Sequence, residues 1–475
     1  MSRHSVRSTF ALAASLALFA ALSATAEEPA PAKKSVTEQV LEILRAQGTI
    51  DDARYQDLKK QLEDEQRAAQ PAPPAEEPKT EVAKTEPAKP AVPDPEGWKI
   101  YFKDTLRVER NDGWAKIHIG GMTQFDFAGI SEDQALREEL DESNQGTGVE
   151  FRRARLSMDG EIGENLIFKS EYDFVGGNAG FRDVWVGLQR LPYAGRALAG
   201  HFKEPMSLEE ITSDRFITFM ERALPVLAFS PARNSGIGAF NSVLNQRMTW
   251  GVGGFRDTDD FGNGFGTSSP YNITARITGL PVWQDDGRTL VHVGYSYSHR
   301  FRDSDDVDFD PRPEVNLSDP LIDTGDIRSH GVDVFGAELS TVVGPFSAQG
   351  EFLDSLVDVK GSGHENLWGA YGYASWFLTG ESRAYDPKIG AFTRTSPKHP
   401  FSIGEGTWGA WELAGRYSYV TLNDDTIRGG IESDVTAAVN WYLYGNFRIM
   451  FNYVFAHRND VGDQNAWMTR FSLDF

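Results

Sequence analysis

The sequence predicts an all-β protein whose main body is a transmembrane antiparallel β-barrel of about 16 strands. From residue 114 to the last residue, polar and apolar residues alternate in one segment after another, as they do along strands with one wet and one apolar face. Many of these segments run for roughly nine residues or more, the length with which a tilted strand crosses hydrocarbon. Several carry Trp or Tyr near an end, as the aromatic girdles of membrane barrels do.

The first expected strand shows this alternation, because Gln124 and Asp126 share one face while Phe125 and Phe127 share the other. Counting such segments gives about sixteen, an even number and a size that leaves an aqueous lumen. Every backbone polar group must be paired inside hydrocarbon, so the sheet has to close. The expected strand cores begin near Trp114, Val149, Leu166, Phe181, Gly195, Gly236, Arg247, Tyr271, Leu290, Ser329, Phe346, Leu367, Trp408, Ile431, Phe447 and Asn465.

Long and short connectors should alternate in such a barrel, and they do for most of the chain. The long connectors are 131–148, 205–235, 256–270 and 302–327. The exception is 380–404, which is long where a short turn is due. Either one strand is miscounted there or that turn is unusually large.

The N-terminus has the pattern of a secretory signal peptide over residues 1–26. Arg3 and Arg7 precede an apolar stretch from Phe10 to Leu22, and small residues precede the expected cleavage after Ala26. The apolar stretch is too short for a membrane-spanning helix, and no later run approaches the roughly 20 apolar residues that such a helix requires. We therefore expect an exported chain.

Two segments separate the signal peptide from the barrel domain, which is expected over residues 98–475. Residues 27–67 are predicted to form a helical, coiled-coil-like segment in the periplasm, because Val36, Val40, Ile43 and Leu44 recur at helical spacing. Residues 68–97 are dominated by Pro, Ala, Lys and Glu. That composition cannot bury a core, so this part is predicted to be a disordered linker.

Composition excludes several functions. The chain has no cysteine, so no disulfide or thiolate site is available. Its 47 basic and 69 acidic residues give a formal charge of −22, which argues against nucleic acid as a partner. The nine histidines are scattered, and no nucleophile elbow, zinc-protease motif or phosphate-cradling Gly-rich loop is present. We expect no enzyme activity, no catalytic residues, no metal and no cofactor.

Several motifs along the barrel resemble those of the phosphate-selective porin O and P family. They are Phe151-Arg152-Arg153-Ala154-Arg155, Phe202-Lys203-Glu204-Pro205, the block from Thr212 to Pro225, Trp376-Phe377-Leu378-Thr379-Gly380-Glu381, and Gly409-Ala410-Trp411-Glu412-Leu413. The resemblance implies an outer-membrane porin of Gram-negative bacteria with sixteen strands, usually a homotrimer, whose third loop folds inward and narrows the pore. Residues 205–235 match that loop. The terminal Phe475 is the mark of barrels that the outer-membrane insertion machinery recognises.

The resemblance also implies a passive channel that prefers small anions such as phosphate. Basic residues favour anions in a pore by replacing lost hydration, and Arg can donate two hydrogen bonds to one phosphate. The anion-pathway candidates on the wall and the loop are Arg152, Arg153, Arg155, Lys169, Lys203, Arg215, Arg222 and Arg233. Parity points Arg153, Arg155 and Lys169 into the lumen, as it does Arg276, Arg416, Arg448 and Arg470. The parity of Arg152 points toward lipid unless a bulge or the rim relocates it.

Acidic residues complicate this expectation. The loop also contains Glu204, Glu209, Glu210, Asp214 and Glu221, and parity places Asp126, Asp159, Glu161, Glu171 and Asp173 on the lumen wall. For any one basic residue, the plainer interpretation is a wall residue paired with an acid. The constriction is therefore expected to be mixed in charge, and the local field decides selectivity.

Alternative functions stay open at this point. A general or sugar-type diffusion porin is the first, with Trp185, Tyr371 and Trp408 as candidate inward aromatics for packing against sugar rings. A barrel-anchored tether that contacts a periplasmic or cell-wall partner through residues 27–67 is the second, and an outer-membrane enzyme is the third. In every case we expect the surroundings to be outer-membrane lipid and lipopolysaccharide.

Overall fold

The computed structural model describes residues 56, 60, 96–140, 145–265, 270–302 and 306–475. The chain divides into two units, residues 1–90 and 91–475, and the second contains every strand described below. The predicted signal peptide lies outside the described residues, as do the helical segment and the linker except for isolated positions. No helix among the described residues is long and apolar enough to cross a membrane.

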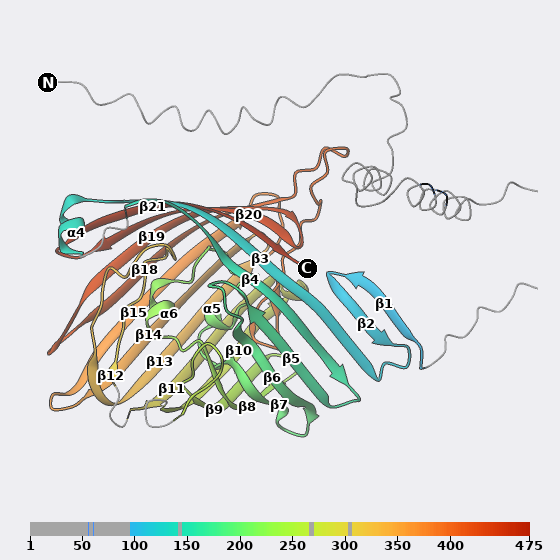
Figure 1. Ribbon diagram of the computed structural model, residues 1–475, viewed down its shortest axis with the longest axis horizontal. Coiled ribbons are helices and arrows are strands. Elements are labelled where there is room, and N and C mark those ends of the chain that lie inside the picture. Colours follow the sequence, from blue (N-terminus) through green and yellow to red (C-terminus); the bar gives the residue numbers. More distant parts are fainter. Residues whose placement is uncertain (1–55, 57–59, 61–95, 141–144, 266–269, 303–305) are drawn as a thin grey trace, which may run out of the picture. The chain divides into compact units, whose positions relative to one another are not determined.

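Sixteen antiparallel strands form a closed barrel, as the sequence predicts (Figure 1). Each strand pairs with its neighbours in chain order, and the last pairs with the first through eleven residue pairs, from Gln464 opposite Glu132 to Asp474 opposite Met122. Every expected strand core falls on or beside one of these strands. They are β3 (Ala115–Glu132), β4 (Gly146–Ile162), β5 (Leu166–Asp173), β6 (Gly180–Leu191), β7 (Gly195–Lys203), β8 (Arg233–Val243), β9 (Met248–Arg256), β10 (Tyr271–Gln284), β11 (Thr289–Phe301), β13 (Ile327–Val343), β14 (Phe346–Val359), β15 (Gly363–Phe377), β18 (Ala410–Asp424), β19 (Ile427–Tyr444), β20 (Phe447–Arg458) and β21 (Gly462–Asp474).

The alternation in the sequence becomes an inner and an outer face. Gln124 and Asp126 are buried toward the lumen, whereas Phe127 and Phe151 on β3 and β4 are about half exposed on the outside. Outer aromatic rings touch across strands, with ring centroids 5.0 Å apart for Phe125 and Phe127 and 4.9 Å apart for Phe125 and Phe151. Lipid would cover this apolar outer surface in a membrane.

The two ends of the barrel differ in their connectors. We call the end where β3 begins and β21 ends the turn end, and the opposite end the loop end. The loop-end connectors up to β13 are the longer ones, and those at 360–362, 425–426 and 459–461 are short. Residues 378–409 lie at the turn end and join β15 to β18, which are paired neighbours. No strand is therefore miscounted, and this turn is unusually large.

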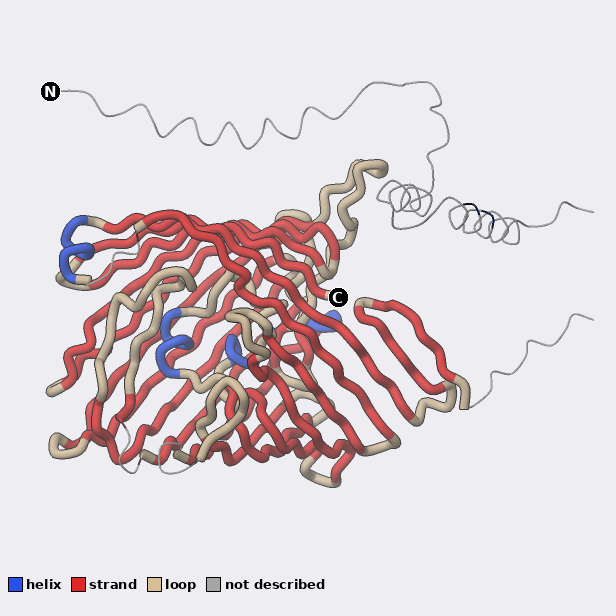
Figure 2. Tube along the Cα trace, viewed as in Figure 1, coloured by secondary structure: helices blue, strands red, loops and turns tan. Residues whose placement is uncertain are grey.

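Two loop-end connectors and part of one turn-end connector lie inside the barrel, and the rest of the turn-end connector projects beyond the barrel end (Figure 2). The lumen loop, residues 204–232, contains the short helices α5 (Leu208–Ile211) and α6 (Leu224–Phe229). The turn-end connector, residues 378–409, contains the small strand pair β16 (Tyr385–Asp386) and β17 (Ala391–Phe392). Leu208 of the lumen loop shares an apolar cluster with Tyr385 and Phe392 of the connector. The loop-end connector 302–326 carries β12 (Asp306–Val307), and its Phe309 packs on Phe229.

A hairpin precedes the barrel and extends its wall at the turn end. The hairpin consists of β1 (Trp98–Lys103) and β2 (Thr105–Arg110), and β2 pairs with β3 from Leu106 opposite Ile119 to Glu109 opposite Lys116. The remaining elements are small: α4 (Gln134–Glu139), whose first turn is capped by Asp133, and the 3-10 turn η1 (Asp285–Gly287).

Candidate functional site: a basic chamber beside the lumen loop

Arg152 reaches the lumen because β4 bulges at this residue. In the register of β3 and β4, Gln124 lies opposite Arg153 and the next residue, Phe125, lies opposite Phe151. Arg152 is thus the extra residue of a β-bulge, which turns its side chain inward against the parity of the strand. Its Nε and Nη2 donate to the two carboxylate oxygens of Glu221 in the lumen loop, both at 2.9 Å.

The lumen loop crosses from β7 to the far wall, where several strands hold it. Arg470 of β21 pairs with Glu221 at 2.6 Å and with Asp126 of β3 at 2.6 Å. Arg448 of β20 donates to the carbonyl of Ile217 at 2.8 Å. The loop is thus attached to both sides of the lumen and narrows it.

Asp214 is the centre of the charge network between the loop and the wall. Arg153 and Arg155 of β4 approach it at 3.2 and 2.7 Å, and Arg222 of the loop approaches it at 2.7 Å. Arg222 also pairs with Glu210 at 2.7 Å, and Lys203 at the end of β7 pairs with the same carboxylate at 3.3 Å.

Two wall acids connect the remaining candidates. Glu171 of β5 forms ion pairs with Lys169 and Arg155 at 3.4 Å each, and with Arg215 of the loop at 3.6 Å. Asp183 of β6 forms ion pairs with Lys169 at 2.6 Å and with Arg233 at 2.8 Å. A third wall acid, Asp173, forms ion pairs with Arg155 at 2.8 Å and with Arg182 at 3.4 Å.

Seven of the eight candidates named from the sequence thus belong to one ion-pair network, and the eighth, Arg152, lies in the adjacent cluster with Glu221. The network joins eight basic residues to five acidic ones. Each candidate therefore has an acidic partner, while the network as a whole keeps an excess of positive charge.

Two buried carboxylates of the lumen loop, those of Asp214 and Glu221, stay ionised. Burial opposes ionisation of Asp214, but Arg153, Arg222 and Arg155 together hold the pKa of its carboxyl well below the usual range. Burial acts in the same way on Glu221, and Arg152 and Arg470 lower its pKa instead. These carboxylates therefore act as fixed anchors for the arginines around them.

A cavity of about 760 Å³ opens beside this network, and we call it the basic chamber. Strands β4 to β10 form its wall, the lumen loop forms one side, and residues 386–389 of the turn-end connector close another. Nine basic and only three acidic residues line it. The basic ones are Arg155, Lys169, Arg190, Arg196, Lys203, Arg215, Arg233, Arg276 and Lys388, and the acidic ones are Glu171, Asp183 and Asp386.

The other loop and wall acids named from the sequence serve as anchors away from the chamber. Glu209 pairs with Arg416 at 3.2 Å and accepts from the backbone N–H of Ala223 at 2.8 Å. Glu204 accepts from the amide of Asn234 at 2.7 Å. Asp159 pairs with His118 at 3.0 Å, and Glu161 lies 3.8 Å from Lys116.

The three candidate inward aromatics do not form a track. Trp185 lines the basic chamber. Tyr371 is buried elsewhere on the wall and donates from its hydroxyl to Glu351 at 2.6 Å. Trp408 precedes β18 in the turn-end connector and is 66% exposed. The structure therefore does not bring these rings together.

Phe475 ends the seam that closes the barrel. Its backbone N–H donates to the carbonyl of Gly121 at 3.1 Å, and its carbonyl accepts from the N–H of Gly121 at 2.8 Å. The side chain is 42% exposed. Its role in insertion stays a prediction.

Sequence reasoning missed part of the chamber. Asp183, which holds both Lys169 and Arg233, follows Arg182 in a strand that is otherwise largely apolar, and that isolated acid was the available signal. Arg190, Arg196 and Lys388 lie in or next to turns, where charge is ordinary, so nothing in the sequence marked them. Among the described residues, no group of three or more His, Cys, Asp or Glu side chains could hold a metal ion.

Two curated proteins are similar to this chain in sequence. A curated protein of Caulobacter vibrioides described as an "Uncharacterized protein" is 28% identical over 407 residues, covering 82% of this chain and 78% of that protein. Porin O of Pseudomonas aeruginosa is 24% identical over 407 residues, covering 77% of this chain and 89% of that protein.

Solved porins are similar at low identity. The anion-selective porin from Comamonas acidovorans has a TM-score of 0.46 at 14% identity, with 76% of this chain and all of that chain covered. OmpT of Vibrio cholerae with loop L8 deleted has a TM-score of 0.49 at 12% identity, with 76% of this chain and 99% of that chain covered. The family profile described as "Phosphate-selective porin O and P" matches residues 117–475. With three quarters of its length matched, the chain belongs to this family and is a channel of the outer membrane, not an enzyme.

Proposed function

We propose that this outer-membrane porin conducts small anions in preference to cations, phosphate among them, and that the basic chamber is the selective part of the path. The single observation that carries the proposal is the lining of the chamber, with nine basic residues against three acidic ones. This lining contrasts with the formal charge of −22 for the whole chain.

The local field in a confined cavity matters more to a passing ion than the net charge of the protein, because low-dielectric walls focus field lines there. Ion pairing does not remove this effect. Six of the nine lining basic residues have carboxylate partners, whereas Arg190, Arg196 and Lys388 have no ion pair recorded in the described part of the chain, so an anion in the chamber meets positive charge that these pairs do not balance. Guanidinium groups also offer paired donors to a phosphate.

Reversal potential in a planar bilayer under a potassium chloride gradient tests the proposal. The wild type should show an anion-favouring potential. Replacing Arg196 and Lys388 by Gln should reduce that potential, since both line the chamber and neither belongs to an ion pair that the structure records among the described residues. Arg328→Gln is the matched control, because its side chain is 82% exposed at the loop end. A cation-favouring wild type would overturn the proposal.

Phosphate is tested in the same bilayer as a competitor. If the chamber binds phosphate, chloride current should fall as phosphate is added, and Arg196→Gln with Lys388→Gln should weaken the block. Anion preference without block would leave a general anion porin. Block by a sugar instead would favour the sugar-type alternative.

The remaining assignments follow from the same proposal. The turn end, where every connector except 378–409 is short and where β3 begins and β21 ends, faces the periplasm, so residues 27–67 lie on that side and are available to a periplasmic or cell-wall partner. The protein assembles as a homotrimer, and lipopolysaccharide contacts its outer wall. Chemical cross-linking in intact cells, followed by gel separation without heating, tests the trimer.

A further inference from the structure

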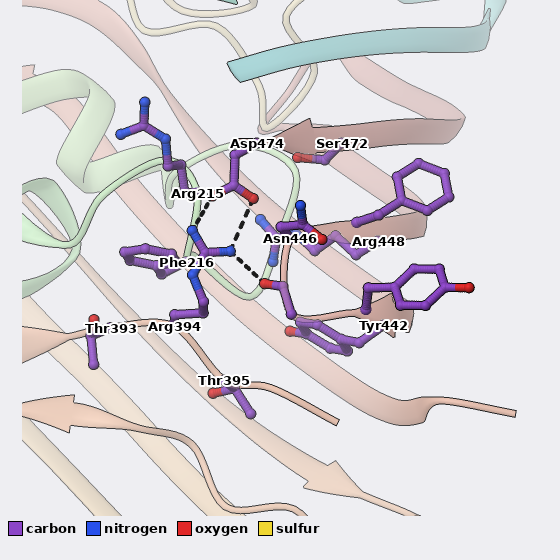
Figure 3. Close-up of a pocket in the computed structure, with 13 residues that line it drawn as sticks. Arg215, Phe216, Thr393, Arg394, Thr395, Tyr442, Asn446, Arg448, Ser472 and Asp474 are labelled. Atoms are coloured by element: carbon purple, nitrogen blue, oxygen red, sulfur yellow. Dashed lines mark hydrogen bonds and ion pairs between the residues drawn. The ribbon is translucent and has the colours of Figure 1, made fainter. Parts of the chain in front are cut away.

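A second, much smaller cavity lies at the turn end of the lumen (Figure 3). Its walls come from four places: Arg215 and Phe216 of the lumen loop, residues 393–395 of the turn-end connector, the turn between β19 and β20, and the ends of β20 and β21. Arg215 is its only lining residue that also lines the basic chamber. The two cavities are therefore neighbours that share one lining residue.

The small cavity is positively charged. Three arginines line it, Arg215, Arg394 and Arg448, against one carboxylate, Asp474. Arg394 occupies both oxygens of that carboxylate, through an Nη1 contact of 3.1 Å and a second contact from Nη2, and it also donates to the carbonyl of Gly445 (Figure 3). Asp474 thus balances Arg394, and Arg215 pairs with Glu171 at 3.6 Å outside the cavity, which leaves the guanidinium of Arg448 to be accounted for.

One hydrogen-bond donor of Arg448, its Nε–H, is unused by the described residues. Arg448 is 5% exposed, and its terminal nitrogens donate to the carbonyls of Ile217 and Asp214. Its Nε has no hydrogen-bond partner among the described residues. A buried N–H without an acceptor is costly, and the guanidinium has no carboxylate partner in the ion pairs recorded for the described part of the chain. Asn446, in the turn beside it, adds an amide side chain to the same lining.

The cavity is small. Its volume is about 20 Å³, and a cavity needs at least about 10–15 Å³ to admit one water-sized sphere. The cavity therefore has room for about one water-sized species, and the basic chamber is far larger.

We propose that this cavity binds one small anion such as chloride or bromide, held by the guanidinium of Arg448 and the amide of Asn446. The site is distinct from the chamber and does not depend on the channel's overall ion preference. A bound anion there would neutralise charge where the lumen loop, the turn-end connector and β20 meet, and so would hold these three segments together.

Bromide is the probe for the test. Crystals of the full-length mature protein, purified from membranes in detergent and soaked in sodium bromide, should show an anomalous peak between Arg448 and Asn446. Asn446→Asp places a carboxylate in the site and should lower bromide occupancy about tenfold or more. Thr393→Asp serves in the same way should the first variant fail to fold, since Thr393 also lines the cavity.

The control is Asn245→Asp, the same change in an exposed turn at the same end of the barrel, and it should leave the peak intact. Density for water alone in bromide-soaked wild-type crystals would overturn the proposal, as would a peak that persists in Asn446→Asp. Arg196→Gln in the chamber should reduce anion preference without removing the bromide peak, so failure of one proposal can be told from failure of the other.

Discussion

Arg152 on the barrel wall holds Glu221 of the lumen loop through two parallel hydrogen bonds of 2.9 Å, across 69 residues of sequence. The bidentate contact exists only because the bulge in β4 turns Arg152 inward. Arg470, which also pairs with Asp126, joins the same carboxylate from the other side of the barrel seam. One carboxylate thus ties the loop to β4 and β21, the two strands that flank β3.

Loss of this carboxylate should destabilise the folded barrel. Glu221→Gln removes the charge that balances Arg152 and Arg470, and breaking a buried ion pair costs about 3 kcal/mol. Equilibrium unfolding by guanidinium in lipid vesicles measures the difference. Glu405→Gln, an exposed residue of the turn-end connector, should change stability little. Equal stability of Glu221→Gln and the wild type would show that the contact is dispensable.

Acid should release the lumen loop only at low pH. The folded-state pKa of both Asp214 and Glu221 is lowered by neighbouring arginines, so the ionised forms stabilise the loop fully above the ordinary value of about 4. That contribution is lost as pH falls through the lower folded values. Single-channel current should stay quiet on acidification from neutral to about pH 4 and become noisy below it. Noise that begins near neutral pH in the wild type would contradict the anchoring role.

Shortening the turn-end connector should widen the pore. Residues 380–408 can be replaced by a two-residue turn, because β15 and β18 are already paired at Phe377 and Glu412. The replacement removes Arg383, Tyr385 and Phe392, which are buried in the lumen. We expect single-channel conductance to rise by about half or more, since these side chains occupy pore cross-section. An unchanged conductance would mean that the conducting path avoids the connector.

Two glycines of the same connector should respond differently to a methyl group. Gly406 and Gly409 have nearly equal positive φ angles of 67° and 68°. A Cβ at Gly406 meets nothing within 4 Å, whereas one at Gly409 would lie 2.2 Å from the carbonyl oxygen of Tyr442. Gly406→Ala should cost about 1 kcal/mol from the backbone conformation alone. Gly409→Ala should cost about 3 kcal/mol or more, because the β18–β19 pairing must also shift. Guanidinium unfolding of the two variants compares them directly.

The C-terminal residue should matter for assembly in cells more than for the finished fold. Phe475→Ala keeps both backbone hydrogen bonds to Gly121 and removes the ring that the sequence marks as an insertion signal. The variant should refold in detergent as the wild type does, while its amount in the outer membrane falls. A normal amount of the Phe475→Ala variant in the outer membrane would show that the ring of Phe475 is not the insertion signal. Deleting the residue outright should impair refolding as well, because the two hydrogen bonds are lost.

The sequence by itself determined the barrel. Polar and apolar residues alternate with the strand period, and a shift by one residue would expose every lumen side chain to lipid, so the strand count and the facing of Arg153, Arg155 and Lys169 could be predicted. The motifs that resemble the family are also short runs of consecutive residues. The family assignment and the closed sixteen-stranded sheet therefore followed from residues near one another in the chain.

Only the tertiary structure decided how the lumen is filled. The facing of Arg152 depends on a bulge, and a bulge is set by pairing with β3 rather than by the residues of β4 alone. The partners of the basic residues come from segments far apart in sequence, such as Asp214 with Arg153 and Asp183 with Arg233. Electrostatic pairing depends on distance in space, which the order of residues does not give, so the chamber and the small anion cavity became visible only once the barrel had closed.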